Sequence, residues 1–170
     1  MFALIFGLSF LANAQDVQKD QPKGYQFTDI KRLPATSVKD QARAGTCWSW
    51  SGISFFESEM IRMGKEPIDL SAMYIVRHAY SDKATKFVRL HGSMNFAVGG
   101  AFCDVMHVIK NYGIVPMDVY MGLNYGEPNH AFGEIDDVLA GYINAVIKNS
   151  NKKLSTAWKK GFDGILDAYL

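Results

Sequence analysis

The sequence has few cysteines, no long apolar run and no excess of charge. Two cysteines among 170 residues are too few for a disulfide scaffold, and 48% hydrophobic residues are enough to form a core without one. Basic and acidic residues nearly balance, 18 against 17, which argues against a nucleic-acid-binding surface. The composition indicates one ordinary globular domain.

Motifs for metal and nucleotide binding are also missing. The histidines and cysteines show no zinc-ligand spacing, and neither G-x-x-x-x-G-K-[ST] nor G-x-G-x-x-G occurs. We therefore expect no metal, no cofactor and no nucleic-acid partner.

The first residues are similar to a secretory signal peptide. An apolar run over residues 2–11 is too short to cross a bilayer, and Ala12-Asn13-Ala14 fits a small-residue cleavage site, although no basic segment precedes the run. The alternative is a buried helix or strand. We expect a signal peptide over residues 1–14, export to the periplasm or the medium, and no membrane anchor after cleavage.

Residues 15–45 mix proline, glycine and charge, which predicts an irregular segment with one short possible strand over residues 25–30. From residue 46 onwards helical patterns dominate. Apolar residues at helical spacing predict five helices, over residues 47–63, 71–85, 101–112, 131–148 and 155–170. The last pattern runs to the final residue, so the chain looks incomplete at its C-terminus.

Three details of these helices can be predicted as well. Ser71 and Ser155 are expected to cap the second and fifth helices. The first helix is apolar on most sides, which is typical of a buried helix. The third is expected to bury one apolar stripe, formed by Phe102, Val105, Met106, Ile109 and Tyr112.

Cys47 opens the first predicted helix, six residues after Gln41. A cysteine in the first turn of a helix lies at the positive end of the helix dipole, which favours the thiolate. Attack by a thiolate on a carbonyl creates an oxyanion, which the backbone N–H of Cys47 and the side-chain amide of Gln41 could hold. Taken alone, the pattern also suits a small buried hydrophobic residue, and a bridge to Cys103 stays open.

Several blocks in order resemble papain-like cysteine peptidases. Q-A-R-A-G-T-C-W-S, at residues 41–49, is similar to the active-site segment, and D-L-S-A-M-Y, at 69–74, to the segment after the central helix. V-G-G-A-F, at 98–102, and Y-G-I-V-P, at 112–116, are similar to the paired glycines of the substrate wall and a later turn. Within the family, Ala44 in place of a disulfide cysteine and the segment N-Y-G-I-V-P-M-D-V-Y most resemble the bleomycin hydrolase or aminopeptidase C branch.

The resemblance implies an α+β papain-like fold, of which residues 46–170 form mainly the helical N-terminal half and the β-rich half is largely missing. It implies peptide-bond hydrolysis through an acyl-enzyme, by an aminopeptidase or an endopeptidase. Cys47 would be the nucleophile, Gln41 the oxyanion donor, and Gly99 and Gly100 would bind the substrate main chain, since a Cβ there would obstruct it. The implied partners are a peptide, the missing C-terminal half in the same or a second chain, and further copies of this chain.

The catalytic base is not assigned by the resemblance. The family's His and Asn lie about 130–150 residues after the cysteine, which places them beyond Leu170. None of the four histidines present has a motif-level claim to the role, and His78 and His107 lie opposite the apolar faces of their helices. We therefore expect this chain alone to be inactive. The alternative is a non-catalytic half-domain or pseudo-peptidase that binds peptides.

Two features depart from that branch. It is typically cytosolic, whereas the leader here points outwards. Cys103 also stands where an aromatic residue usually follows the paired glycines. Because Gln41 and Cys47 are intact, the peptidase is favoured over the pseudo-peptidase.

Overall fold

The computed structural model describes residues 24, 25, 27–150 and 153–170, in two units, Met1–Arg32 and Leu33–Leu170. The expected signal peptide over residues 1–14 lies outside the described residues. In the described part of the first unit no strand forms, and Tyr25, Phe27 and Ile30 are exposed. A strand needs a neighbour to pair with its backbone N–H and C=O groups, and these residues form no such pair. The strand predicted over residues 25–30 is therefore wrong.

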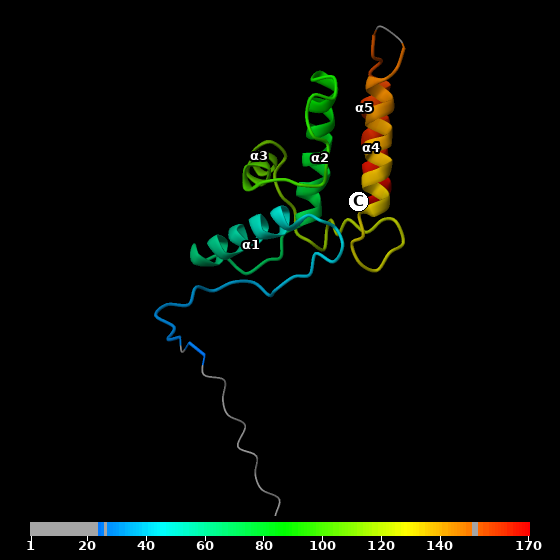
Figure 1. Ribbon diagram of the computed structural model, residues 1–170. Helices are drawn as coiled ribbons and strands as arrows, with labels where there is room; N and C mark the ends of the chain where they lie inside the picture. The colour runs from blue at the N-terminus through cyan, green and yellow to red at the C-terminus, as the bar shows by residue number, and fades with distance from the viewer. Residues whose placement is uncertain (1–23, 26, 151–152) are drawn as a thin grey trace, which may run out of the picture. The chain divides into compact units, whose positions relative to one another are not determined.

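The described residues of the second unit form five helices: α1 Cys47–Arg62, α2 Ala72–Arg89, α3 Phe102–Tyr112, α4 Gly133–Ile147 and α5 Ala157–Tyr169. α2 packs against all the others, and α4 and α5 lie side by side (Figure 1). β-type pairing within the described residues is limited to single bridges, Arg43 with Ala131 and Leu70 with Pro116. The expectation of a mainly helical chain is confirmed.

α2 forms the centre of the core. It begins as predicted at Ser71, whose hydroxyl accepts a hydrogen bond from the Tyr74 N–H at 2.9 Å and donates one to the Tyr120 carbonyl at 2.6 Å. Lys86 and Arg89 lie in its last turn, where the helix dipole favours positive charge. Its buried residues occupy more than one face, because helices pack on several sides of it.

α1 is buried on one side only, so the prediction of a fully buried helix is wrong. Trp48, Ile53 and Glu57 are buried, whereas Cys47 and Phe55 are exposed. The sequence pattern did not reveal the exposed side of α1, because small Ser and Gly residues occur on its buried side as well as on its exposed side. The exposed side of α1 is the one that carries the thiol.

The apolar stripe predicted for α3 is also partly wrong. Val105 and Val108 are its buried residues, whereas the side chains of Phe102, Met106 and Tyr112 are 45%, 49% and 43% exposed. Gly52 on α1 explains the register, since a Cβ there would lie 2.8 Å from a methyl group of Val105. The close approach of α1 thus selects the two valines for burial.

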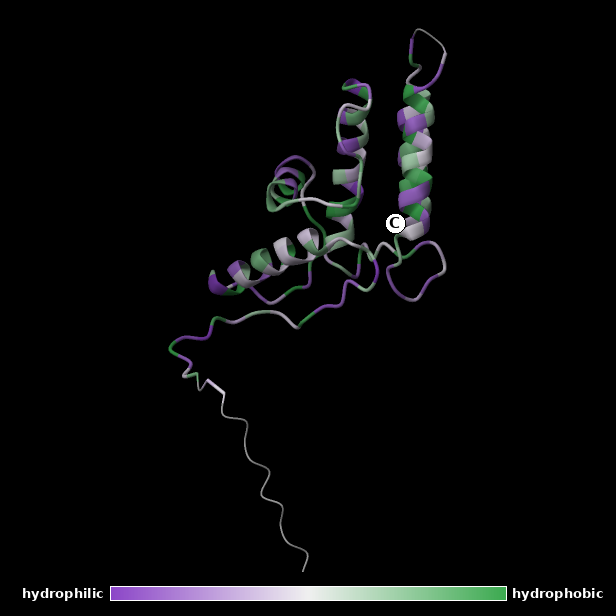
Figure 2. Ribbon diagram, viewed as in Figure 1, coloured by the Kyte–Doolittle hydropathy of each residue, from purple (hydrophilic) through white to green (hydrophobic). Residues whose placement is uncertain are grey.

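α4 and α5 are amphipathic, each with buried residues on one face, and hydrophilic and hydrophobic colours alternate along the column in which the two helices overlap in Figure 2. α5 buries Phe162 and Leu166, and Leu170 is 2% exposed. Its N-cap is Thr156 rather than the predicted Ser155, although the Ser155 hydroxyl accepts a hydrogen bond from the Ala157 N–H at 3.2 Å. No helix in the described residues has the length and apolar character needed to cross a bilayer.

Candidate active site

A turn held by hydrogen bonds and a left-handed backbone leads into α1. The Asp40 carboxylate accepts a hydrogen bond from the Ala42 N–H at 2.7 Å, and Ala42 has a φ of 51°. A left-handed conformation is strained for alanine and is retained only where its surroundings fix it. Arg43 supplies that restraint, because its N–H and C=O pair with residues 130 and 132 at 2.9 and 3.2 Å.

The same turn leaves Cys47 exposed at the first position of α1. The preceding Thr46 is fully buried, and its hydroxyl accepts a hydrogen bond from Trp50 Nε1 at 3.2 Å instead of capping the helix. Among the described residues, no hydrogen bond engages the Cys47 backbone N–H or its thiol. An accessible sulfur and an unpaired N–H therefore lie together at this helix terminus. Cys103 is also exposed and free, so the two cysteines form no bridge.

Cys47 and Gln41, which the sequence paired, line the same groove. The groove has a volume of about 450 Å³ and lies between the exposed side of α1 and the segment before the turn, lined by Ala35, Thr36, Ser37, Val38, Lys39, Gln41, Cys47, Trp50, Ser51 and Ser54. The amide oxygen of Gln41 is buried and has no hydrogen-bond partner in the described part of the chain. Since the oxygen is the buried end of the amide, the nitrogen is the end available to the groove.

A buried carboxylate fixes one wall of this groove. Glu57 of α1 is 1% exposed and accepts hydrogen bonds from the Leu70 N–H at 2.7 Å, from Lys39 Nζ at 3.0 Å and from the Thr36 hydroxyl. Lys39 also pairs with Asp69 at 2.7 Å. Burial disfavours its charge, but the hydrogen bonds to Asp69 and Glu57 outweigh burial and raise the pKa of Lys39. The segment that carries Gln41 is thereby tied to the helix that carries Cys47.

Trp48 joins the groove to the paired glycines. Its Nε1 donates to the Val98 carbonyl at 3.0 Å, and its ring lies where a Cβ on Gly100 would approach within 2.5 Å. Gly99 has nothing within 4 Å of the corresponding position and is exposed. The structure thus brings both glycines beside the start of α1, but their surroundings differ. Gly100 leaves room for the Trp48 ring, whereas the space beside Gly99 is unoccupied.

Sequence reasoning missed Lys83. Its ammonium group lies 5.4 Å from the centre of the Trp48 ring and donates hydrogen bonds to the carbonyl of Gly99 and, at 3.4 Å, to that of Ala97. Burial lowers the pKa of Lys83. The only sequence signal was its position three residues after Tyr80, on a face of α2 that is otherwise buried.

Two of the four histidines are engaged with groups far from Cys47 in the sequence. His78 is half-buried, with its ring stacked on Tyr112 at 4.3 Å between centroids, so its position opposite the apolar face of α2 does not leave it fully exposed to solvent. His107 is exposed as expected and lies 3.1 Å from an Asp82 oxygen. Neither forms a hydrogen bond with the thiol.

The other two histidines lie in loops. His91 follows α2 with a φ of 49° and is exposed. His130 is 6% exposed, its ring centroid lies 5.8 Å from that of Trp50, and its Nδ1 is buried without a partner among the described residues. Burial lowers the pKa of His130, which disfavours an imidazolium there. No hydrogen bond links either ring to Cys47 within the described chain.

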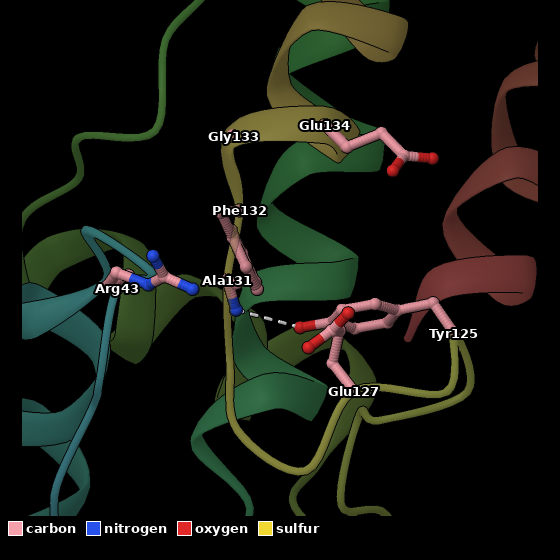
Figure 3. A pocket seen from close by; sticks show the side chains of 7 residues that line it. All are labelled: Arg43, Tyr125, Glu127, Ala131, Phe132, Gly133 and Glu134. Carbon is pink, nitrogen blue, oxygen red and sulfur yellow. Dashed lines mark hydrogen bonds between the residues drawn. The ribbon is translucent and has the colours of Figure 1, made fainter.

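A second groove, of about 510 Å³, is lined by Arg43 together with residues of the loop before α4 and the start of that helix (Figure 3). Arg43 stands on one side of residues 131–133, and Tyr125 and Glu127 stand on the other, with the Tyr125 hydroxyl accepting a hydrogen bond from the Ala131 N–H at 2.9 Å. It holds neither a cysteine nor a histidine. We place the candidate active site in the smaller groove because that groove contains the thiol. Nowhere in the described residues do three His, Cys, Asp or Glu side chains gather in a way that could hold a metal.

Comparison with known proteins identifies the family of this chain. Residues 22–157 match the papain family of cysteine proteases. Because the match spans most of the chain, including Gln41, Cys47, Gly99 and Gly100, the chain belongs to the papain family of cysteine proteases. A search of curated proteins found no match to it.

Proposed function

We propose that Cys47 is the nucleophile of a cysteine peptidase and that the groove between α1 and residues 35–41 is part of its cleft. The observation that carries this proposal is the exposed thiol at the start of α1, in one groove with Gln41 and beside Gly99 and Gly100. The family supplies the reaction class, which is hydrolysis of a peptide bond.

The residues suit that chemistry as follows. The Cys47 sulfur attacks the carbonyl carbon of the scissile bond, while its proton passes to a base. The carbonyl oxygen becomes an oxyanion, which accepts hydrogen bonds from the unpaired Cys47 N–H and from Gln41 Nε2. The C–N bond then breaks, the base returns the proton to the leaving amine, and water hydrolyses the thioester.

Gly99 is the better candidate of the two glycines for contact with substrate. No atom lies within 4 Å of the place where its Cβ would stand, so a peptide main chain has room to approach. Its carbonyl is held by Lys83, which fixes the direction of the wall. Gly100 contributes by allowing Trp48 to pack beneath this wall.

We infer that the base is an imidazole other than the four histidines of this sequence, because the family's His lies about 130–150 residues after the cysteine. In the described residues, none of the four forms a hydrogen bond with Cys47. We propose that the β-rich half of the papain-like domain supplies it, together with the Asn that orients it. Similarity of the segments around the glycines supports the bleomycin hydrolase or aminopeptidase C branch. The apolar run over residues 2–11 supports export, and the exposed apolar side chains of α1 and α3 support association with a second chain or copy.

Hydrolysis of a blocked peptide anilide by this chain, with and without added imidazole, tests the proposal. Without imidazole we expect no turnover above that of Cys47→Ala. With imidazole we expect slow hydrolysis that depends on both Cys47 and Gln41, because the small base replaces the absent side chain.

A second candidate is a non-catalytic peptide-binding module, favoured by the absence of any histidine bonded to the thiol in the described residues. Peptide binding that persists in Cys47→Ala, with no hydrolysis under either condition, would support this candidate over the peptidase.

A further inference from the structure

A separate pocket of about 240 Å³ adjoins the paired glycines. α2 contributes Tyr80, α4 contributes an acidic wall, and the segment just before Gly99 closes it; the lining is Tyr80, Phe96, Ala97, Val98, Asp136, Asp137 and Ala140. Val98 also accepts the hydrogen bond from Trp48. The pocket is therefore next to the proposed substrate wall, and the proposed chemistry uses none of its polar groups.

The acidic wall consists of Asp136 and Asp137 of α4, and no basic side chain forms a salt bridge with either of them among the described residues. Lys83 lies over the Tyr80 ring, but its ammonium group donates to main-chain carbonyls instead. Burial and the neighbouring Asp137 raise the pKa of Asp136 to about 6, as expected for a carboxylate without a counter-charge.

A buried hydroxyl in the same pocket also lacks a partner. Tyr80 is 2% exposed, and its hydroxyl is buried without a hydrogen bond in the described part of the chain. Burial raises the pKa of Tyr80 most, followed by the charge of the Asp136 carboxylate and a hydrogen bond to it, whose geometry is too poor to satisfy the hydroxyl. Buried hydroxyls nearly always have a partner, and leaving one without a partner is unfavourable. The hydroxyl is thus a group for a ligand to satisfy.

The chemistry of the pocket selects one class of ligand. A primary ammonium group has three N–H donors, enough to reach the Tyr80 hydroxyl and both carboxylates. Phe96, Val98 and Ala140 offer apolar surface for the methylene groups that precede it. A metal ion is disfavoured, because no cluster of three acidic, His or Cys side chains occurs in the described residues.

We propose that this pocket binds a primary ammonium group of a peptide, either its N-terminal amine or the side chain of a lysine. This inference rests on the proposed function, since it takes the peptide to lie along Gly99. It makes the pocket a subsite that selects substrates by positive charge.

Binding to the full chain, followed by amide resonances of Ala97, Val98 and Ala140, tests the proposal without requiring turnover. The probes are Nα-acetyl-lysine methylamide, alanine methylamide with a free amine, and neutral Nα-acetyl-norleucine methylamide. At neutral pH we expect one or both amines to bind and norleucine not to bind. Asp136→Asn and Asp137→Asn should each weaken binding about tenfold, because each removes a charged hydrogen bond.

Glu134→Gln is the matched control, since it removes the same charge from α4 but lines the other groove. It should leave the affinity unchanged. A response to lysine alone assigns the pocket to a side chain, and a response to alanine methylamide alone assigns it to the N-terminus. Equal binding of norleucine, or no binding of either amine, would overturn the proposal. Binding of amines to a chain whose Cys47 is inert would leave this inference standing and remove only the peptidase.

Discussion

Gly99 and Gly100 are adjacent in the sequence, yet their surroundings differ. The sequence could predict that both glycines lie near Cys47, because the segment V-G-G-A-F resembles the paired glycines of the family's substrate wall. It could not predict that the Trp48 ring occupies the space above Gly100 while Gly99 stays open. That difference depends on contacts between residues about fifty positions apart.

Gly100→Ala should therefore destabilise the protein, whereas Gly99→Ala should not. The new Cβ at residue 100 would stand 2.5 Å from the Trp48 ring, and overpacking of this kind costs about 2 kcal/mol. Thermal unfolding of the two variants measures the difference. Gly99→Ala should instead lower peptide affinity, and equal melting temperatures for both variants would contradict the assigned packing.

Asp136 gives a prediction about pH. Its pKa is raised from 3.8 to about 6, so the Asp136 carboxylate binds a proton more tightly in the folded protein than in the unfolded chain. The free energy of unfolding should accordingly fall as pH rises from about 4 to about 6 and level off above that. The groups that face Asp136 are Asp137 and Tyr80, with Lys83 beyond the Tyr80 ring.

Asp136→Asn should remove this contribution. At pH 7 it should raise the free energy of unfolding by about 1 kcal/mol, a figure reduced for solvent screening because the carboxylate is only half-buried. Denaturant titrations at several pH values check this. An Asp136→Asn variant with the same pH dependence as the unchanged protein would show that another group is responsible.

At the scale of the helices, α1 shows what the periodicity of apolar residues can predict and what it cannot. Its start at Cys47 was predictable, because a helix pattern begins there and the motif fixes the cysteine at its first turn. Its half-exposure was not predictable, because exposure depends on what covers the helix. The same limit explains α3, where close approach of α1 at Gly52 buries the two valines in place of Phe102 and Met106.

Glu57 connects α1 to the wall of the groove, and removing its carboxylate should affect both. Glu57→Ala leaves the Leu70 N–H and the Lys39 ammonium without their buried acceptor and should cost about 3 kcal/mol. Equilibrium unfolding gives the free energy. The spectral shift of Trp50, which lines the groove, reports whether the wall moves.

Glu59→Gln is the control on the same helix. Glu59 pairs with Arg62 on the surface, and an exposed pair of this kind contributes little. We expect no measurable change in stability. If Glu57→Ala proved equally silent, the buried carboxylate would not be what holds residues 36–39 against α1.

At the scale of the whole molecule, exposed aromatic surface on α1 and α3 suggests association. Phe55 and Phe102 are 52% and 45% exposed, and their rings pack edge to face at 5.5 Å between centroids. The Phe56 ring stacks on that of Phe102, and Met106, one turn further along α3, is also exposed, so apolar side chains gather in a patch on this surface. The sequence did not predict the place of this patch, because its periodicity assigned Phe102 and Met106 to the core.

Sedimentation velocity over a range of concentrations should therefore show self-association of this chain. Phe55→Ser should weaken it, because the change removes apolar area from the patch. Val119→Ser is the control, since Val119 is 69% exposed outside the patch. A monomer at all concentrations, or equal effects of the two substitutions, would contradict the prediction.

The most direct test of the central claim compares the two cysteines of one molecule. Cys47 and Cys103 are both exposed, and each lies in the first turn of a helix, although Asp104 stands beside Cys103 and no acidic residue lies in the first turn of α1. Comparing two reagents on each thiol cancels this difference in reactivity. Their alkylation rates are measured by mass spectrometry with iodoacetamide and with a peptidyl chloromethyl ketone. We predict that the peptidyl reagent favours Cys47 over Cys103 by about tenfold more than iodoacetamide does, and that Gln41→Ala abolishes the preference. The same ratio for both reagents would contradict the assignment of Cys47 to a peptide-binding active site.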